Sequence, residues 1–318
     1  MKDNHRHFVI FNPASGRGRG QRRIARYRSL LEDALENVRF ATTTYPGEEA
    51  ELADRAIAEG YDVVVAVGGD GTWSNVADRL VSSGRQDIAL GILPNGTGND
   101  FGRNLGYNPR NIAQAVSVLA TGHTLLSDVG HVYSLSTSEN HPDTEEARHF
   151  LNLIGFGFDV AVIDAAKKAR FLKGELLYKV TALQQILRFP GFHFTMRSAG
   201  GKQRAGEHLM LTLSNGTYFG GGFPIAPGAS VTDGRLHACS IIDSSSFSRL
   251  KLFNMAEKGQ HVTSHKVEII DDLSFHLTFD APPRFEMDGE VRHSSTRKVD
   301  VRILPGALRV ISPEVTPA

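Results

Sequence analysis

The sequence predicts an N-terminal α/β domain built on a doubly wound, mostly parallel sheet, followed by a β-rich sandwich domain. Three observations predict this: 318 residues are many for one hydrophobic core, strand and helix patterns alternate in the first part, and strand patterns dominate afterwards. We therefore predict a first domain over residues 1–127 and a second over residues 128–300. The tail, residues 301–318, begins with strand character and is expected to return to the first domain.

The elements of the first domain follow from their apolar patterns. A buried strand ends at Pro13, and helical spacing ends at Gly60 and again at Gly122. The predicted strands are residues 7–13, 39–45, 62–67 and 88–94, and the predicted helices are residues 22–38, 48–60, 75–83 and 111–122.

The second domain has short strand patterns with two long helical stretches between them, and a polar exposed loop over residues 136–148. One of these stretches, residues 171–189, is amphipathic. It predicts either a helix packed on the core or a lip that receives an acyl chain at a bilayer surface. The predicted strands are residues 126–135, 149–158, 192–198, 208–216, 235–242, 274–280 and 284–292.

Composition and charge narrow the class of protein. The 35 basic and 35 acidic residues cancel, so nothing favours a nucleic-acid partner. The one cysteine, Cys239, lies in an alternating strand pattern and predicts a buried thiol in a reducing compartment. The sequence has neither a signal-peptide pattern nor a transmembrane-length apolar run, so we expect a cytoplasmic protein whose membrane contact is peripheral.

A glycine loop, GGDGT, follows the strand over residues 62–67. Glycine lets a ligand approach the backbone, and a helix beginning near Trp73 would direct its N–H groups at an anion. Asp70 would order a metal or fix the loop, and Thr72 would cap the helix or donate to a phosphate. A tight turn without a ligand is the alternative for this loop alone.

A second loop of the same kind follows the next strand, with the sequence NGTGNDFGR over residues 95–103. Two such loops at neighbouring strand ends predict a ligand crevice. The P-loop, Rossmann and protein-kinase patterns are absent. Asn99 and Asp100 are candidates either for ligand contact or for holding the loop together.

Ordered sequence blocks carry a resemblance to a known family. They are FNPASG (11–16), GGDGT (68–72), PNGTGNDFGR (94–103), FLNLIGFGFDV (150–160), SNGTYFGGGFPIAPGASVTDGRL (214–236) and MDGE (287–290). In these blocks, over nearly its whole length, the chain resembles the diacylglycerol kinase catalytic family, bacterial soluble lipid kinases related to sphingosine and ceramide kinases. The resemblance implies an NAD-kinase/diacylglycerol-kinase-like fold, with ATP and Mg²⁺ as cofactors.

The resemblance also implies roles for particular residues. Mg²⁺ would be held around Ser230, Asp233 and Arg235, where the sequence TDGR also fits a plain turn. At Asn75 the chain departs from the family, which usually has a glutamate there. The residues implied for ATP are Asn12, Thr43, Gly69, Asp70, Gly71, Thr72, Trp73, Ser74, Asn75 and Thr97.

Glu290 is the implied proton acceptor, with Asp70 as a second catalytic residue. A hairpin turn explains Asp288 and Gly289 but gives no reason for Glu290. Its carboxylate is ionised at neutral pH and able to take the proton of an attacking hydroxyl.

The sequence therefore predicts an ATP-dependent lipid kinase that phosphorylates the hydroxyl of diacylglycerol or a similar neutral lipid, with a role in phospholipid biosynthesis. An NAD kinase-like enzyme and a nucleotide-sensing protein without turnover are the alternatives. We expect transient docking on a membrane through Lys167, Lys168, Arg170 and Lys173 beside the stretch 171–189, and leave monomer and homodimer open.

Overall fold

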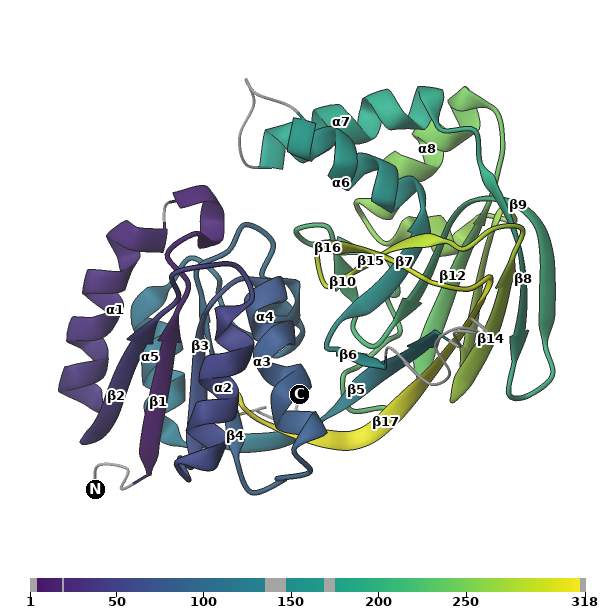
Figure 1. Ribbon diagram of the computed structural model, residues 1–318. Coiled ribbons are helices and arrows are strands. Elements are labelled where there is room, and N and C mark those ends of the chain that lie inside the picture. The colour runs from purple at the N-terminus through teal and green to yellow at the C-terminus, as the bar shows by residue number, and fades with distance from the viewer. Residues whose placement is uncertain (1–4, 19, 135–146, 169–174, 315–318) are drawn as a thin grey trace. The chain divides into compact units, whose positions relative to one another are not determined.

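The structure is a computed structural model that describes residues 5–18, 20–134, 147–168 and 175–314. The chain divides into unit 1, Met1–Asp128 with Pro305–Ala318, and unit 2, Val129–Leu304 (Figure 1). It passes from one unit to the other twice, within strand β5 (Thr124–Ser134) and within strand β17 (Lys298–Ile311). The boundaries after residues 128 and 304 lie close to the predicted ones after residues 127 and 300.

Strands β1 to β4 of unit 1 pair in parallel with one another, and β4 pairs in parallel with β17. The order of the strands is β2-β1-β3-β4, followed by the end of β17, where Val310 pairs with Leu90 of β4. Every residue of β3 and β4 is buried, as expected for parallel strands covered on both faces. The strands are β1 (Arg6–Phe11), β2 (Asn37–Thr42), β3 (Val63–Gly68) and β4 (Ala89–Pro94).

Helices cover both faces of this sheet, which confirms the doubly wound fold class. Helix α1 (Gly20–Ala34) packs with α5 (Ile112–Thr121), and α2 (Glu48–Ala58) packs with α3 (Asp70–Ser82) on the opposite face (Figure 1). The short helix α4 (Asp100–Asn104) follows β4. The chain reverses direction across the sheet between β1 and β3, so their carboxyl ends flank a topological switch point.

Helix α3 begins earlier than the sequence predicted. It starts at Asp70 instead of near Trp73, because the Trp73 N–H already bonds the Gly69 carbonyl at 3.0 Å. The second half of the GGDGT loop, Asp70 to Thr72, is therefore the first helical turn.

Unit 2 is β-rich and antiparallel. Its main path is β16-β15-β7-β9-β8-β14-β17, while β12 pairs with β9 and β13, and β6 pairs with β5. A separate pair, β10 (Tyr218–Phe219) and β11 (Phe223–Pro224), stands apart from it. The strands are β6 (Arg148–Phe150), β7 (Leu153–Gly157), β8 (Phe192–Ser198), β9 (Gln203–Ser214), β12 (Leu236–Ile242), β13 (Val267–Asp272), β14 (Ser274–Phe279), β15 (Arg284–Met287) and β16 (Glu290–His293).

Two apolar cores hold unit 2 together. The larger lies among side chains of the strands themselves, including Phe156, Leu213 and Phe275. The second lies between the strands and helices α6 (Phe158–Lys168), α7 (Glu175–Arg188) and α8 (Ser246–Ala256). Cys239 is buried in this second core, and burial raises the pKa of its thiol to about 12.

The described part of unit 2 thus has three helices where the sequence predicted two long helical stretches. Helix α8 reads SFSRLKLFNMA, with apolar residues on all sides and no apolar stripe to identify it. Most of the predicted polar loop over residues 136–148 lies outside the described residues.

Candidate functional site

The two glycine loops of unit 1 touch each other at the carboxyl ends of β3 and β4. A Cβ added at Gly96 would lie 2.5 Å from the Cα of Gly69, and one added at Gly69 would lie 3.0 Å from the Cα of Gly96. The Asn95 N–H also donates to the Gly68 carbonyl at 2.7 Å. Because neither loop has room for a side chain at this contact, glycine is required on both sides.

The first turn of α3 presents groups that suit an anion. The N–H groups of Gly71 and Thr72 have no backbone acceptor within the helix, that of Asp70 faces its own carboxylate, and the helix dipole favours negative charge there. The hydroxyl of Thr72 accepts a hydrogen bond from Asn12 Nδ2 at 2.9 Å, which leaves its own proton to donate. Gly68 makes this arrangement possible, since a Cβ there would lie 2.5 Å from that of Thr72.

Asn12 organises the end of β1. Its side-chain oxygen accepts the Ala14 N–H at 3.0 Å, while its amide nitrogen reaches Thr72. A second link joins Ser15 to the other loop, because Asn95 Nδ2 donates to the Ser15 hydroxyl at 3.0 Å. Sequence reasoning missed Ser15 and Asn95, since only the fold brings these strand ends together.

Asp70 shares its surroundings with a second carboxylate. Its Oδ1 accepts the Phe101 N–H at 3.0 Å. A Cβ added at Gly98 would lie 3.1 Å from Asp70 Oδ2 and 3.3 Å from Asp100 Oδ2, so both oxygens converge on this glycine. Desolvation, together with the charge of Asp100, raises the pKa of Asp70.

Asn99 holds the second loop in shape. It adopts a left-handed backbone with φ of 55°, and its side chain bonds both the N–H and the carbonyl of Gly96. The structure therefore gives Asn99 a loop-holding contact, the second of its two predicted roles.

The other residues predicted for the nucleotide differ in exposure. Trp73 is fully buried, and its indole donates to the Ala66 carbonyl at 3.0 Å, so this side chain packs the core. Thr43 and Ser74 are also buried, whereas Thr97 is exposed. The Thr43 N–H bonds the Phe11 carbonyl at 2.9 Å, which fixes the end of β2 beside β1.

The side chain of Asn75 on α3 contacts that of Glu49 on α2. Asn75 Nδ2 donates to Glu49 Oε1 at 2.9 Å. Glu49 belongs to the first turn of α2 and is only 4% exposed, and its Oε2 has no hydrogen-bond partner among the described residues. No local sequence pattern identifies this pair, because only the packing of α2 against α3 brings the two side chains together.

The predicted proton acceptor, Glu290, belongs to the β15–β16 hairpin of unit 2. Asp288 and Gly289 form the turn with positive φ values of 47° and 91°. The buried Asp288 carboxylate accepts the N–H groups of residues 151–153 at 2.7–3.1 Å and anchors the hairpin. Glu290 itself is exposed and contacts Arg292 at 3.1 Å.

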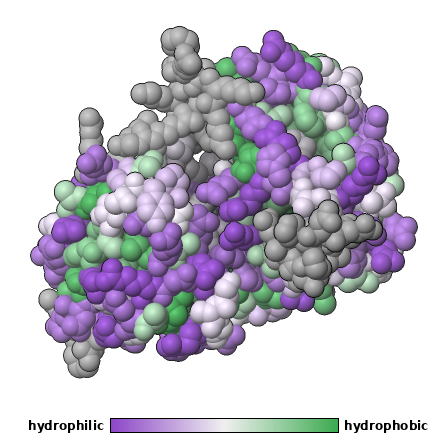
Figure 2. Space-filling model, viewed as in Figure 1, coloured by the Kyte–Doolittle hydropathy of each residue, from purple (hydrophilic) through white to green (hydrophobic). Residues whose placement is uncertain are grey.

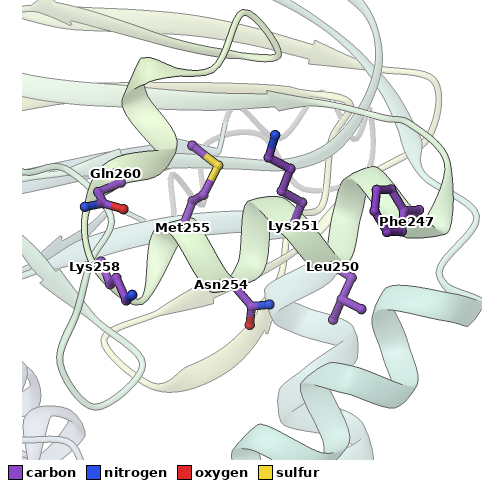
Figure 3. Close-up of a pocket in the computed structure, with 7 residues that line it drawn as sticks. All are labelled: Phe247, Leu250, Lys251, Asn254, Met255, Lys258 and Gln260. Carbon is purple, nitrogen blue, oxygen red and sulfur yellow. The ribbon is translucent and has the colours of Figure 1, made fainter.

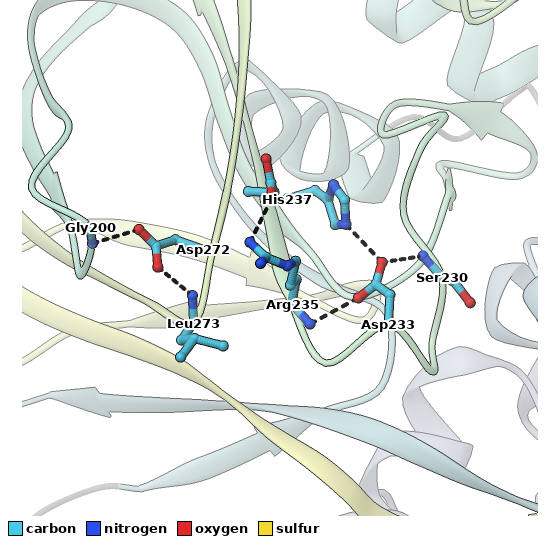
Figure 4. A network of polar contacts seen from close by, with 8 residues as sticks. Gly200, Ser230, Asp233, Arg235, His237, Asp272 and Leu273 are labelled. Carbon is cyan, nitrogen blue, oxygen red and sulfur yellow. Dashed lines mark hydrogen bonds and ion pairs between the residues drawn. The ribbon is translucent and has the colours of Figure 1, made fainter.

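Asp233 is held by several donors of its own turn. Its carboxylate accepts the N–H groups of Ser230 at 2.9 Å and Arg235 at 2.8 Å, and lies 2.9 Å from His237 Nε2 (Figure 4). The Arg235 guanidinium donates to Asp271 at 2.7 Å. These contacts fit the plain-turn interpretation, and Mg²⁺ at Ser230, Asp233 and Arg235 stays a prediction.

A buried carboxylate that sequence reasoning missed lies at the start of α6. Asp159 Oδ1 accepts the Val160 N–H at 2.8 Å, and its Oδ2 lies beside Gly155 without a hydrogen-bond partner in the described structure. Burial raises the pKa of Asp159 to about 7.

The predicted docking segment is only partly described. Residues 169–174, with Arg170 and Lys173, lie outside the described ranges, as do the side chains of Lys167 and Lys168. In the last turns of α7, Ala182 and Ile186 are buried while Leu183 and Leu187 are exposed. No helix in the described part of the chain is long and apolar enough to cross a membrane.

Two packed glycine loops at the carboxyl ends of neighbouring parallel strands form the kind of place where α/β proteins bind phosphate-containing ligands, and here they belong to a doubly wound unit that is joined to a β-rich unit. Residues 6–132 match the diacylglycerol kinase catalytic domain, and residues 152–312 match the YegS C-terminal NAD kinase beta sandwich-like domain. The chain belongs to this family of lipid kinases.

Curated relatives and solved structures agree with this assignment. A diacylglycerol kinase of Mycobacterium tuberculosis is 28% identical over 96% of this chain and 94% of its own length. A probable YegS-like lipid kinase of Klebsiella pneumoniae is 26% identical over 95% of both chains. The crystal structure of a putative diacylglycerol kinase from Bacillus anthracis shares the fold, with a TM-score of 0.77, 21% identity and 98% coverage of both chains.

Proposed function

We propose that this lipid kinase transfers the γ-phosphoryl group of ATP to the hydroxyl of diacylglycerol or a similar neutral lipid. The observation that carries the proposal is the contact of two glycine loops in front of the first turn of α3. The names of the curated relatives support the choice of acceptor, because diacylglycerol kinases align over nearly the whole chain. Such an enzyme would work at the cytoplasmic face of a membrane and supply phospholipid biosynthesis.

The groups at the start of α3 suit the phosphates of ATP. The backbone of Gly69, Asp70 and Gly71 offers N–H groups, and the Thr72 hydroxyl has a proton to donate. Asn12 would act by orienting Thr72. We assign supporting contacts to Thr43, Ser74 and Thr97 through their hydroxyls and to Asn75 through its side-chain oxygen. Trp73, whose N–H and indole are bonded to Gly69 and Ala66, would support the loop by packing behind it.

The carboxylates of Asp70 and Asp100 fit a hard cation. Mg²⁺ prefers oxygen ligands and is usually held by one or two carboxylates together with substrate phosphates. The convergence of Asp70 Oδ2 and Asp100 Oδ2 on Gly98 provides two such oxygens. When bound, Mg²⁺ would neutralise phosphate charge.

The oxygen-rich turn at Asp233 suits a second, structural Mg²⁺. Asp233 Oδ1 accepts a hydrogen bond from the Arg235 N–H and has a second lone pair for a cation. Backbone carbonyls of the Ser230 to Arg235 turn would complete the set of ligands. The Arg235 side chain, which bonds Asp271, would not take part.

We assign the proton of the lipid hydroxyl to the carboxylate of Glu290. As the hydroxyl oxygen forms its bond to the γ-phosphorus, the bond to the β,γ-bridging oxygen breaks and ADP leaves. The hydroxyl proton passes to Glu290, which is exposed and ionised at neutral pH. The anchoring of the hairpin by Asp288 would hold this carboxylate in place.

The presence of Asn75 in place of the family's usual glutamate does not by itself favour the alternative of a nucleotide-sensing protein without turnover. Glu49 places an acidic side chain against Asn75, so α2 supplies the acidic group that the family usually has at position 75. The sensor and the NAD kinase remain the alternatives to be tested.

The test incubates the protein with γ-labelled ATP, Mg²⁺ and a panel of neutral lipids in mixed micelles, with NAD in a parallel reaction. The proposal predicts label in diacylglycerol or a related lipid, and none in NAD. Label in NAD alone would establish the alternative enzyme, and ATP binding without transfer to any acceptor would establish the sensor.

A further inference from the structure

The inner face of α8 is firmly fixed to unit 2. Leu252 and Ala256 are buried in the core beneath the helix. The buried Arg249 donates to Asp243 at 2.8 Å and to the carbonyls of Ile186 and Phe189 at 3.0 and 2.7 Å. These bonds join the start of α8 to the end of α7.

The outer face of α8 is also apolar, although no described residue covers it. Phe247 is 80% exposed and Leu250 is 36% exposed. The two side chains border a hollow of about 360 Å³ (Figure 3). Apolar side chains gathered on an exposed face are typical of interaction surfaces, which indicates that a partner covers this one.

Exposed apolar side chains concentrate around this helix. Nine large ones are exposed in the described structure. Four of them lie on α7 and α8, and two more, Ile242 and Val262, lie four residues before and six residues after α8 in the chain. The Asp243–Arg249 ion pair lies where the end of α7, the end of β12 and the start of α8 meet. The six are Leu183, Leu187, Ile242, Phe247, Leu250 and Val262.

The charges beside the hollow are positive. Lys251 and Lys258 line it, with no carboxylate among its seven described lining residues (Figure 3). Asp243 is held by Arg249, and the acidic residue of this stretch, Glu257, follows the last turn of α8. Exposed Arg188 at the end of α7 adds another positive charge.

We propose that the α8 face, formed by Phe247, Leu250, Lys251 and Lys258, docks on an anionic lipid bilayer. Aromatic and leucine side chains beside lysines are the composition of surfaces that insert at the headgroup boundary. A second copy of the chain fits less well, because a two-fold contact through this face would bring its lysines together. The proposal rests on the proposed function, which places the acceptor lipid in a bilayer.

The test measures binding of the full chain to vesicles by co-sedimentation, without ATP. Vesicles of phosphatidylcholine with phosphatidylglycerol are compared with phosphatidylcholine alone. Two double variants are used, Phe247→Ala with Leu250→Ala and Lys251→Gln with Lys258→Gln. The matched control joins Leu273→Ala with Lys202→Gln, because both of these residues are exposed on other parts of unit 2.

The proposal predicts that the wild type prefers anionic vesicles and that salt weakens this binding. Each lysine near an anionic surface is worth about a fivefold gain in affinity. The lysine variant should therefore bind anionic vesicles about 25-fold more weakly, and the apolar variant should lose binding to both kinds of vesicle. The control should bind like the wild type.

Activity separates this proposal from the proposed function. All variants should phosphorylate a short-chain, water-soluble diacylglycerol at the wild-type rate. If both α8 variants bind vesicles like the wild type, the α8 face is not the docking surface. If the variants instead lose self-association while vesicle binding is unchanged, the face binds a second copy of the chain and the proposal is wrong. If vesicle binding depends on the α8 face but no lipid is phosphorylated, the docking surface stands and the proposed function fails.

Discussion

Asn75, in the second turn of α3, and Glu49, in the first turn of α2, form one polar pair. The amide donates to the buried Glu49 side chain at 2.9 Å, so one acidic side chain is present there. Two carboxylates at that distance would repel each other in surroundings of low dielectric constant. We therefore expect the protein to accept the acidic side chain on either α2 or α3, but not on both helices at once.

A double-mutant cycle tests this exchange. We expect Asn75→Glu alone to lower the free energy of unfolding at pH 8, because it brings two carboxylates together. Adding Glu49→Gln should restore most of the loss, with a coupling energy of about 0.5–3 kcal/mol. Thermal denaturation and ATP affinity of the four proteins give the answer, and additive effects in the double variant would show that the two side chains do not interact.

Asp159 makes stability depend on pH. Burial raises its pKa in the folded protein to about 7, against about 3.9 in an unfolded chain. The folded state therefore binds the proton more tightly, and the stabilisation present below pH 4 is lost as the pH rises through about 7. Above that pH the wild type retains a buried charge.

Replacing Asp159 by Asn removes that charge with little change of shape. The melting temperature of Asp159→Asn relative to that of the wild type should be higher at pH 8 than at pH 5. The change corresponds to about 1–3 kcal/mol in the free energy of unfolding. Scanning calorimetry at both pH values measures this. A difference between the two proteins that does not vary with pH would show that Asp159 stays ionised, or protonated, throughout.

At the scale of elements, the loops after β3 and β4 act as one body. The contact between Gly69 and Gly96, the bond from Asn12 to Thr72 and the bond from Asn95 to Ser15 tie the ends of three strands together. The sequence could predict the two loops, because each has its own glycines after an apolar strand. It could not predict their contact, which depends on the order of the strands.

Gly96→Ala tests this contact. The added methyl would lie 2.5 Å from the Gly69 backbone, which cannot rotate away, so we expect a loss of about 1–3 kcal/mol and weaker ATP binding. Gly228→Ala is the matched control, since nothing lies within 4 Å of a Cβ there. Equal melting temperatures for the two variants would contradict the close approach of the loops.

The starts and numbers of helices show where local patterns fail. Helix α3 begins at Asp70, inside the GGDGT loop. Its start is hard to predict because Gly68 and Gly69 precede it and Gly71 lies in its first turn. Helix α8 escaped prediction because its exposed Phe247 removes the apolar stripe that marks most surface helices.

At the scale of the whole molecule, the chain builds a parallel α/β unit, leaves it at β5 and returns through β17. The alternation of strands and helices predicted the first unit, and its fold class is confirmed by the parallel sheet and the family match. The ordered blocks of sequence predicted the lipid kinase family. Contacts such as Glu49 with Asn75, or Asp288 with the backbone of residues 151–153, join distant segments and leave no local trace.

The division of labour between the units is the central claim of the proposed function: unit 1 binds ATP, and Glu290 of unit 2 accepts the proton. Glu290→Gln keeps the size and the hydrogen bonding of this exposed side chain but cannot accept a proton. Glu207→Gln, at another exposed glutamate of unit 2, is the matched control.

The most direct measurement is the single-turnover rate of phosphoryl transfer from ATP to diacylglycerol in mixed micelles, made together with the equilibrium affinity for ATP. For Glu290→Gln the account predicts an unchanged affinity and a rate lower by about 10²–10⁴-fold, while Glu207→Gln matches the wild type in both. A wild-type rate in Glu290→Gln, or a defect confined to ATP affinity, would contradict it.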